Sequence, residues 1–201
     1  MATRKFKELD QQAHDRFQER LKLLGIDPGD VPESVTISDG ARSSGLLSKK
    51  IVVRDVAHLK AVGGIPDDDY TERHHSDRHI EYPELTDDLT RRFGAAKGDA
   101  GAVARLLTAE DRTTVGNAMR AFLLGNSSKV PQPFVDAINA LEFPMEVTVT
   151  VGKDIVVNGE WLLGKDGPET VQAGTITIEP TGYIKCVDKV NIDVGIFARV
   201  N

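Results

Sequence analysis

The densest group of chemically capable side chains in this chain is a short histidine-rich segment at residues 72–79. It holds three of the five histidines together with a carboxylate, as His74, His75, Asp77 and His79. Alternate residues share one face of a strand, and residues four apart share one face of a helix, so either conformation could aim two imidazoles at one ion. Imidazole and carboxylate groups are ligands of zinc and similar divalent transition metals. The segment therefore permits a metal site, with zinc as the fitting ion.

Other features of the histidine-rich segment favour a solvated polar loop. An acidic run at 67–69 precedes it, and Arg73 and Arg78 within it would repel a cation. The sequence lacks the His-Glu-x-x-His pattern of many catalytic zinc sites. Protonation of the imidazoles below ~pH 6.5 could instead change the charge of an interface. We expect no cofactor, and a metal-dependent enzyme or a metal or pH sensor is the alternative hypothesis for this segment.

Residues suited to nucleophilic or nucleotide chemistry form no recognisable pattern. The glycine-containing stretch at 39–45 lacks the lysine that follows the glycines of a phosphate-binding loop. Cys186 is the single cysteine and lies at an expected inward position of a strand, where a thiol packs as a small apolar group. With no catalytic residue predicted, the sequence favours a protein that is not an enzyme.

Four aromatic residues are candidates for an interface or a ligand site. Trp161 and Tyr183 could stack on a sugar or anchor a partner, although a tryptophan beside a turn also packs in a core. Phe6 and Phe17 lie on the apolar stripe of a helix predicted over residues 3–24. That stripe needs a partner surface, either on its own domain or on a neighbouring subunit.

The overall composition is that of an ordinary globular protein and argues against two classes of partner. The chain has 201 residues, of which 40% are apolar and 28% charged, and its net charge is -6. An acidic chain lacks the clustered bases that release counterions from a phosphate backbone, so nucleic acid is not expected. No apolar window reaches the ~18 residues of a membrane span, and the N-terminus lacks a secretory signal. We expect a cytoplasmic protein, with leaderless release as the alternative.

Periodicity and turn residues divide the chain into four segments. We predict an amphipathic helix at 1–25, an irregular arm with short strands at 26–85, a helical segment at 86–143 and a β-rich domain at 144–201. Within the arm, the expected elements are strands at 35–37 and 49–53 and a helix at 55–62. Helix starts are expected near Thr86, Asp99, Thr108 and Pro133.

The residues after 144 alternate between apolar and polar side chains, as strands do. Val147, Val149 and Val151 predict a buried face, and the threonines between them predict a face in contact with water. The Asn158-Gly159 pair between two apolar runs predicts a tight hairpin turn. The expected fold class is therefore α+β, with a C-terminal antiparallel sheet that forms a sandwich or barrel. A β-solenoid is the rival, since residues 174–182 could form part of one turn, but no fixed repeat is apparent.

Open sheet edges, a long irregular arm and the scarcity of catalytic patterns together favour a non-catalytic role. We therefore predict a binding or self-assembling structural protein that acts through its β-rich C-terminal domain and its extended arm. The expected partner is a second copy of the chain or another protein. A carbohydrate-binding sandwich that uses Trp161 and Tyr183 is a further alternative.

Overall fold

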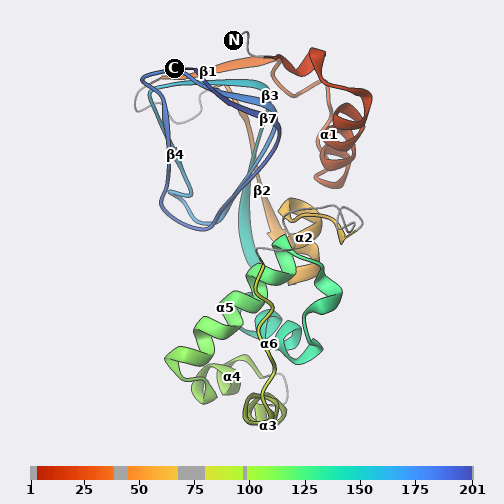
Figure 1. Cartoon of the computed structure of the whole chain (residues 1–201), viewed down its shortest axis with the longest axis vertical. Helices are drawn as coiled ribbons and strands as arrows, with labels where there is room; N and C mark the ends of the chain where they lie inside the picture. Colours follow the sequence, from red (N-terminus) through yellow and green to blue (C-terminus); the bar gives the residue numbers. More distant parts are fainter. Residues whose placement is uncertain (1–3, 39–44, 68–79, 97–98, 201) are drawn as a thin grey trace. The chain divides into compact units, whose positions relative to one another are not determined.

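A computed structural model describes residues 4–38, 45–67, 80–96 and 99–200 of the chain. The fold is α+β, and the chain forms two compact units (Figure 1). One unit, called the β-unit below, comprises Met1–Ile51 and Glu146–Asn201. The other, called the helical unit, comprises Val52–Met145. The helical unit is therefore continuous in sequence, whereas the β-unit is built from two distant stretches.

The strands of the β-unit form mostly parallel pairs. The strands are β1 (Ser34–Ser38), β2 (Leu47–Val53), β3 (Met145–Asn158), β4 (Glu160–Leu163), β5 (Glu169–Ile178), β6 (Tyr183–Cys186) and β7 (Val190–Arg199). One sheet has the order β1-β3-β5-β7, with β2 also paired to β3, and a second sheet contains β4 and β6. The pairs β1/β3, β3/β5, β5/β7 and β4/β6 are all parallel.

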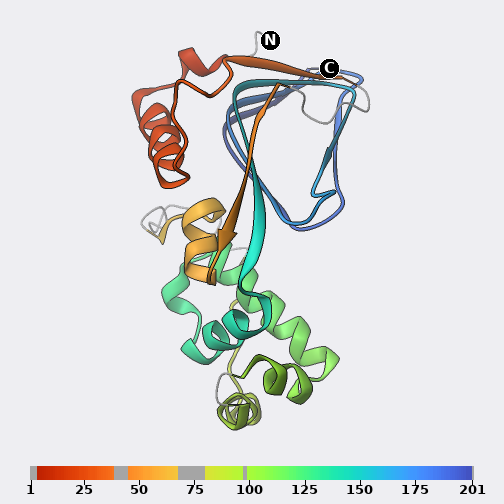
Figure 2. The ribbon, with the colours of Figure 1, turned by 180° about the vertical axis from the view of Figure 1, so that it is seen from behind.

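The register of these pairs shows that the chain coils as a short β-solenoid. Thr148 lies opposite Glu169, and Glu169 lies opposite Val190, so each turn of the coil takes 21 residues along this side. In Figures 1 and 2 the strands coloured teal to blue follow the same outline, one behind another. Each turn therefore pairs with the turn before it and the turn after it.

The predicted antiparallel sandwich or barrel is wrong, and the predicted hairpin is wrong with it. Strands β3 and β4 meet at Asn158-Gly159, but they pair with different strands. A hairpin turn of the expected type needs positive φ at both central residues. In the described part of the chain, the glycines with positive φ are Gly25, Gly45, Gly164 and Gly167. The Asn158-Gly159 pair is instead a corner of the coil.

The water-facing side predicted for β3 is confirmed at Glu146, which is exposed, but it is wrong at Thr150, where the strand is buried on both sides. Val149 and Val151 are fully buried, as predicted, but Thr150 between them is only 1% exposed. Its hydroxyl donates to Glu169 Oε1 at 2.6 Å, which satisfies the buried oxygen. Strands of parallel sheets are commonly covered on both faces, and they then lose the water-facing side that antiparallel strands keep.

Unequal corners explain why no fixed repeat is visible in the sequence. Register partners are 21 residues apart between β5 and β7, but Glu160 pairs with Tyr183, 23 residues away. The corner before β6 is thus two residues longer than the corner before β4, and the next corner is two residues shorter. A comparison at one constant period therefore loses alignment on every turn.

Apolar side chains stacked in columns form the core of the β-unit. Val35, Ile155 and Ile176 occupy one such column, since each lies in register with the next. Trp161 and Leu163 on β4 complete the buried cluster from another side of the coil, and each is 1% exposed. Burial of such side chains is the main favourable term in the stability of this unit.

A helix covers the outside of the coil. The first helical elements are η1 (Phe6–Glu8) and α1 (Gln11–Leu23), and α1 packs on β5. The predicted helix is confirmed over Gln11–Leu23, but residues 6–8 form a separate 3-10 turn before it. The N-cap Asp10 separates the two, and its side chain accepts from Ala13 N at 2.9 Å. Arg20 of α1 is 5% exposed, and its Nε lies 3.3 Å from Asp193 Oδ2 of β7.

The helical unit packs its helices around one apolar cluster. Its elements are α2 (Val56–Gly63), α3 (Asp87–Ala96), α4 (Ala100–Leu106), α5 (Ala109–Leu124), η4 (Ser127–Lys129) and α6 (Gln132–Glu142). Phe134 and Ile138 of α6 are fully buried beside Ala118 and Phe122 of α5. The predicted caps are confirmed at Asp99, which accepts from Ala102 N, and at Thr108, which accepts from Asp111 N.

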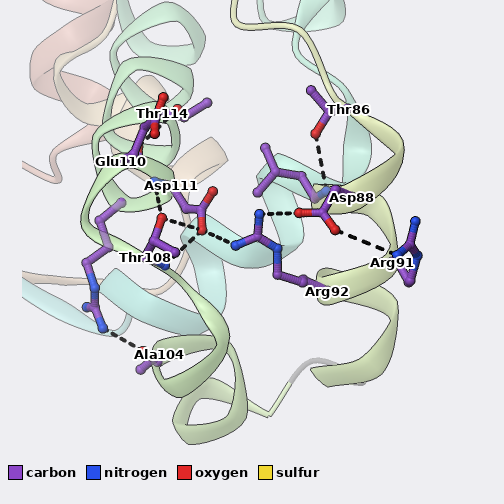
Figure 3. Close-up of polar contacts among 11 residues, drawn as sticks. Thr86, Asp88, Arg91, Arg92, Ala104, Thr108, Glu110, Asp111 and Thr114 are labelled. Atoms are coloured by element: carbon purple, nitrogen blue, oxygen red, sulfur yellow. Dashed lines mark hydrogen bonds and ion pairs between the residues drawn. The ribbon is translucent and has the colours of Figure 1, made fainter.

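A polar cluster joins α3 to the start of α5 (Figure 3). Arg92 of α3 donates to both Asp88 and Asp111. The Asp111 carboxylate also accepts from Thr108 N and Thr108 Oγ1, each at 2.8 Å. Because Asp111 lies in the first turn of α5, its negative charge also faces the positive end of that helix.

A buried lysine caps the other end of α5. Lys60 of α2 donates from Nζ to the carbonyl oxygens of Phe122 and Gly125, each at 2.7 Å. The same ammonium lies 3.1 Å from Asp67 Oδ1. Carbonyl groups at a helix C-terminus carry partial negative charge, so a cation there stabilises the helix.

Two residues near the histidine-rich segment bond to the junction that follows α5. Asp67 accepts from Ser127 N at 2.8 Å, and the Tyr82 hydroxyl accepts from Asn126 N at 2.7 Å. The side chains of one residue before 68–79 and one residue after it are therefore bonded to two consecutive residues of the helical unit.

Substitution of Gly174 tests the coiled geometry. A Cβ at this position within β5 would lie 2.1 Å from the Phe6 ring and 2.7 Å from Lys153 O of the preceding turn. We expect Gly174→Ala to lower the free energy of unfolding of the β-unit by ~1–3 kcal/mol because of this crowding. Urea denaturation followed by the fluorescence of Trp161, the only tryptophan, measures the effect. The control is Gly116→Ala in α5, where a Cβ meets nothing within 4 Å; an unchanged midpoint for Gly174→Ala would contradict the coil.

The polar cluster around Asp111 predicts a pH dependence of the helical unit. Burial acts to raise the pKa of Asp111, but the Thr108 hydrogen bonds and the Arg92 charge outweigh burial and lower the pKa. Such a carboxylate adds stability above its unfolded pKa of ~3.9, and this contribution is lost as the pH falls toward the lower folded value. The difference in unfolding free energy between wild type and Asp111→Asn should be constant from about pH 5 to 7 and shrink below ~pH 4. Urea denaturation followed by circular dichroism at 222 nm measures it, and an equal difference at pH 3 would be the contrary result.

Candidate interaction surface at the last turn of the solenoid

The last turn of the solenoid, residues 183–199, has a strand neighbour on one side only within the described chain. Strand β6 pairs with β4, and β7 pairs with β5. On the other side, the described residues supply no strand to either of them. Among the described residues, no strand therefore pairs with the outer edges of β6 and β7, and such strand edges readily pair with another chain.

The backbone of β7 shows which amide groups lie on this free edge. Val200 N donates to Ile178 O at 2.8 Å, so the amide of Val200 points toward β5. Backbone groups of successive residues in a strand point to opposite sides. The amides of Phe197 and Arg199 therefore point toward the free edge.

The hydrophobic core of the solenoid is uncovered at the same end. Ile155 and Ile176 of one column are fully buried, whereas Phe197, in register with Ile176, is 52% exposed. A second column shows the same change, since Leu163 is 1% exposed and its register partner Cys186 is exposed. Side chains that continue the buried columns of the core are therefore exposed at the last turn.

The first turn of the solenoid is covered, in contrast to the last. Strand β1 lies parallel to β3 and places Val35 opposite Ile155 and Ile37 opposite Val157. All four of these side chains are buried, and Ile37 is only 1% exposed. Strand β1 therefore acts as a cap, which solenoids need at their ends because a terminal turn otherwise exposes apolar side chains.

Exposed apolar side chains are concentrated on the last turn. Tyr183 is 49% exposed, Val187 52% and Phe197 52%. The other large apolar side chains that are clearly exposed in the described chain are dispersed, namely Leu23, Val52 and Leu106. Aromatic residues at the centre of an apolar patch with a polar rim are typical anchors of protein interfaces.

The charges on the last turn are mixed. Three basic and two acidic residues belong to it, namely Lys185, Lys189, Arg199, Asp188 and Asp193. The Tyr183 hydroxyl donates to Glu160 Oε2 at 2.8 Å, which fixes the tyrosine ring on the side of the coil. The last turn therefore carries charges of both signs beside its exposed apolar side chains.

The four predicted aromatic candidates have different environments. Tyr183 lies on the last turn, whereas Trp161 is 1% exposed inside the coil and has no surface for a sugar ring. Phe6 and Phe17 pack on each other, with their ring centroids 4.9 Å apart. Phe17 is 7% exposed, so the apolar stripe of α1 is covered within its own unit.

The predicted metal ligands His74, His75, Asp77 and His79 lie outside the described residues. In the part of the chain that is described, no group of three or more His, Cys, Asp or Glu side chains is arranged to hold a metal ion. No helix there is long and apolar enough to cross a membrane.

Sequence analysis placed Cys186 at an inward position but did not detect the surface to which it belongs. The inward position agrees with its register opposite Leu163, but the expectation that the thiol is buried is wrong. No turn follows that would cover it within the described residues. The partly buried Ile192 and Val194 of β7 were missed for the same reason. The signal that would have revealed them is the 21-residue spacing of apolar positions, such as 155, 176 and 197.

Comparisons of this chain with protein-family models, with curated proteins and with solved structures find no match. The function must therefore be inferred from the residues themselves.

Two alanine substitutions in one column test whether the core is open at the last turn. We expect Ile176→Ala to lower the free energy of unfolding by ~2–5 kcal/mol, because it leaves a cavity in the middle of the column. Phe197→Ala should cost only about 1 kcal/mol, since half of this larger side chain is already in water. Urea denaturation followed by Trp161 fluorescence measures both. Equal losses for the two variants would show that Phe197 is covered.

Proposed function

We propose that this protein is a non-catalytic binding protein that docks β-strands of a protein partner onto the last turn of its solenoid. The observation that supports this most directly is the difference between the two ends of one core. Strand β1 covers Ile155 at the first turn, whereas Phe197 in the same column is 52% exposed. A partner strand added along β7 would do at the last turn what β1 does at the first.

Two kinds of interaction would contribute to the docking. The amides of Phe197 and Arg199 on the free edge would pair with main-chain groups of an incoming strand, which gives affinity with little dependence on sequence. The side chains of Phe197, Val194 and Ile184 would be covered by apolar residues of that strand, which gives specificity. Burial of the exposed half of Phe197 alone would contribute about 1 kcal/mol.

A synthetic strand tests this function directly. The probe is a fluorescein-labelled peptide of residues 169–189, one full turn, with serine in place of Cys186, and binding is followed by fluorescence anisotropy. We expect saturable binding to the wild-type protein. Phe197→Glu should weaken binding at least tenfold, which corresponds to ~1.4 kcal/mol, because it places a charge in the apolar contact. Leu106→Glu, at an exposed apolar residue of the helical unit, is the matched control.

A second variant removes only the backbone contribution. Arg199→Pro deletes an amide on the free edge and leaves the Val200 amide bonded to Ile178 O. It should weaken peptide binding in the same way. Absence of saturable binding to the wild type, or equal binding to Phe197→Glu, would exclude the last turn as a docking surface.

A further inference from the structure

The Asn158-Gly159 pair, where β3 meets β4, has the residue types for a reaction of the chain with itself. A backbone nitrogen that follows asparagine can attack the side-chain carboxamide of the same asparagine, because the chain holds the two groups close together. Asparagine is counted among the thermolabile residues. Glycine in the next position favours the attack, since its nitrogen is not shielded by a neighbouring side chain.

The carboxamide of Asn158 is exposed and polarised. The Thr181 hydroxyl donates to Asn158 Oδ1 at 2.7 Å, and the whole side chain of Asn158 belongs to an exposed residue. Attack on Asn158 Cγ places negative charge on this oxygen, and a donor already aimed at the oxygen stabilises that charge. The side-chain nitrogen of Asn158 donates to no other described residue, so it can leave into water.

The backbone nitrogen of Gly159 is available as the nucleophile. Within the part of the chain that the structure describes, this nitrogen donates no hydrogen bond, although Gly159 O accepts from Tyr183 N at 2.9 Å. The corresponding nitrogen after Asn126 is engaged, because Ser127 N donates to Asp67 Oδ1 at 2.8 Å. The two asparagines therefore differ in the group that must attack.

We propose that Asn158 is a site of spontaneous deamidation through a cyclic imide, in which the Thr181 hydroxyl stabilises the oxyanion. Gly159 N loses its proton to hydroxide and forms a bond to Asn158 Cγ. The bond between Cγ and Nδ2 then breaks, and Nδ2 takes up a proton from water and leaves as ammonia. Water opens the imide at Cγ to give aspartate, or at the main-chain carbonyl carbon to give isoaspartate. The reaction consumes water, releases ammonia and needs no oxidant or reductant.

The isoaspartate product changes the coil, because its main chain contains an additional carbon atom. Val157 O accepts from Glu179 N, and Gly159 O accepts from Tyr183 N, each at 2.9 Å. These bonds fix the main chain on both sides of Asn158 to the next turn of the coil. Additional backbone between bonded positions disrupts a ladder, as a β-bulge does. Formation of isoaspartate therefore weakens the pairing of the coil irreversibly.

Peptide mass spectrometry after incubation of the folded protein in water enriched in heavy oxygen tests the site. Trypsin releases residue 158 in the peptide 154–165 and Asn126 in the peptide 121–129. We expect the first peptide to gain the label as a mixture of isoaspartate and aspartate, and the second to stay unlabelled over the same time. The rate should rise with pH, since Gly159 N must give up its proton.

Two variants identify the groups that react. Asn158→Gln keeps an amide but would need a larger ring, so the peptide 154–165 should stay unlabelled. Thr181→Val removes the donor to Oδ1 and should lower the rate of labelling at least threefold. The fluorescence of buried Trp161 checks that each variant is folded.

The outcomes bear on separate parts of the proposal. An unlabelled peptide 154–165 from the folded wild type would overturn it. Label found as aspartate alone would overturn the cyclic route, because direct hydrolysis of the side chain gives no isoaspartate. An unchanged rate in Thr181→Val would overturn the part assigned to Thr181.

A comparison with Asn158→Asp separates the effect of the added charge from that of the longer main chain. The isoaspartate form is isolated from incubated wild-type protein by ion exchange, and both proteins are unfolded in urea. We expect the isoaspartate form to unfold at a lower urea concentration than Asn158→Asp, which has the same charge and a normal main chain. Equal midpoints would overturn the effect on the coil.

Discussion

The β-unit depends on one constraint: each turn of a solenoid buries its apolar side chains only against the turns beside it. Ile176 is fully buried because Ile155 precedes it in the column and Phe197 follows it. A terminal turn has one such neighbour, so the end of the coil needs a cover. At the first turn, β1 provides this cover. At the last turn, no described residue does, and the proposed function follows from this difference between the two ends.

The helical unit is stabilised in a different way, by charged groups at the ends of its helices. Asp111 meets the positive end of α5 and Arg92, whereas Lys60 meets the carbonyl groups at the negative end. Each charge is therefore placed where the helix dipole favours it. These contacts join helices that are distant in sequence. The apolar side chains of the same helices pack in one buried cluster that contains Phe134.

Local features of the fold could be predicted from the sequence, because the interactions that determine them act within a few residues. The caps at Asp99 and Thr108, and the left-handed Gly25 after the first helix, are of this kind. Strand positions near 35–37 and 49–53 were also found, as β1 and β2. In each case the residue type favours the same backbone conformation in almost any context.

The direction of strand pairing could not be predicted, because it depends on residues far apart in sequence. Alternating valines fit a parallel sheet as well as an antiparallel one, and the Asn158-Gly159 pair serves equally at a corner. The unequal corners hide the 21-residue spacing, and the cap β1 lies 120 residues before its partner, with Ser34 opposite Asp154. The open end could therefore be recognised only when the register was known.

The separation of β1 from the rest of the coil has a consequence for folding during synthesis. The helical unit is one uninterrupted stretch, so all of its residues are translated before residues 146–201, which form most of the coil. Strand β1 is made early but has no partner until β3 appears, after the whole helical unit. Contacts over such long separations form slowly, because a large loop must be closed first. Strand β1 therefore stays unpaired while the helical unit is translated. The helices can fold first, and the coil is completed last.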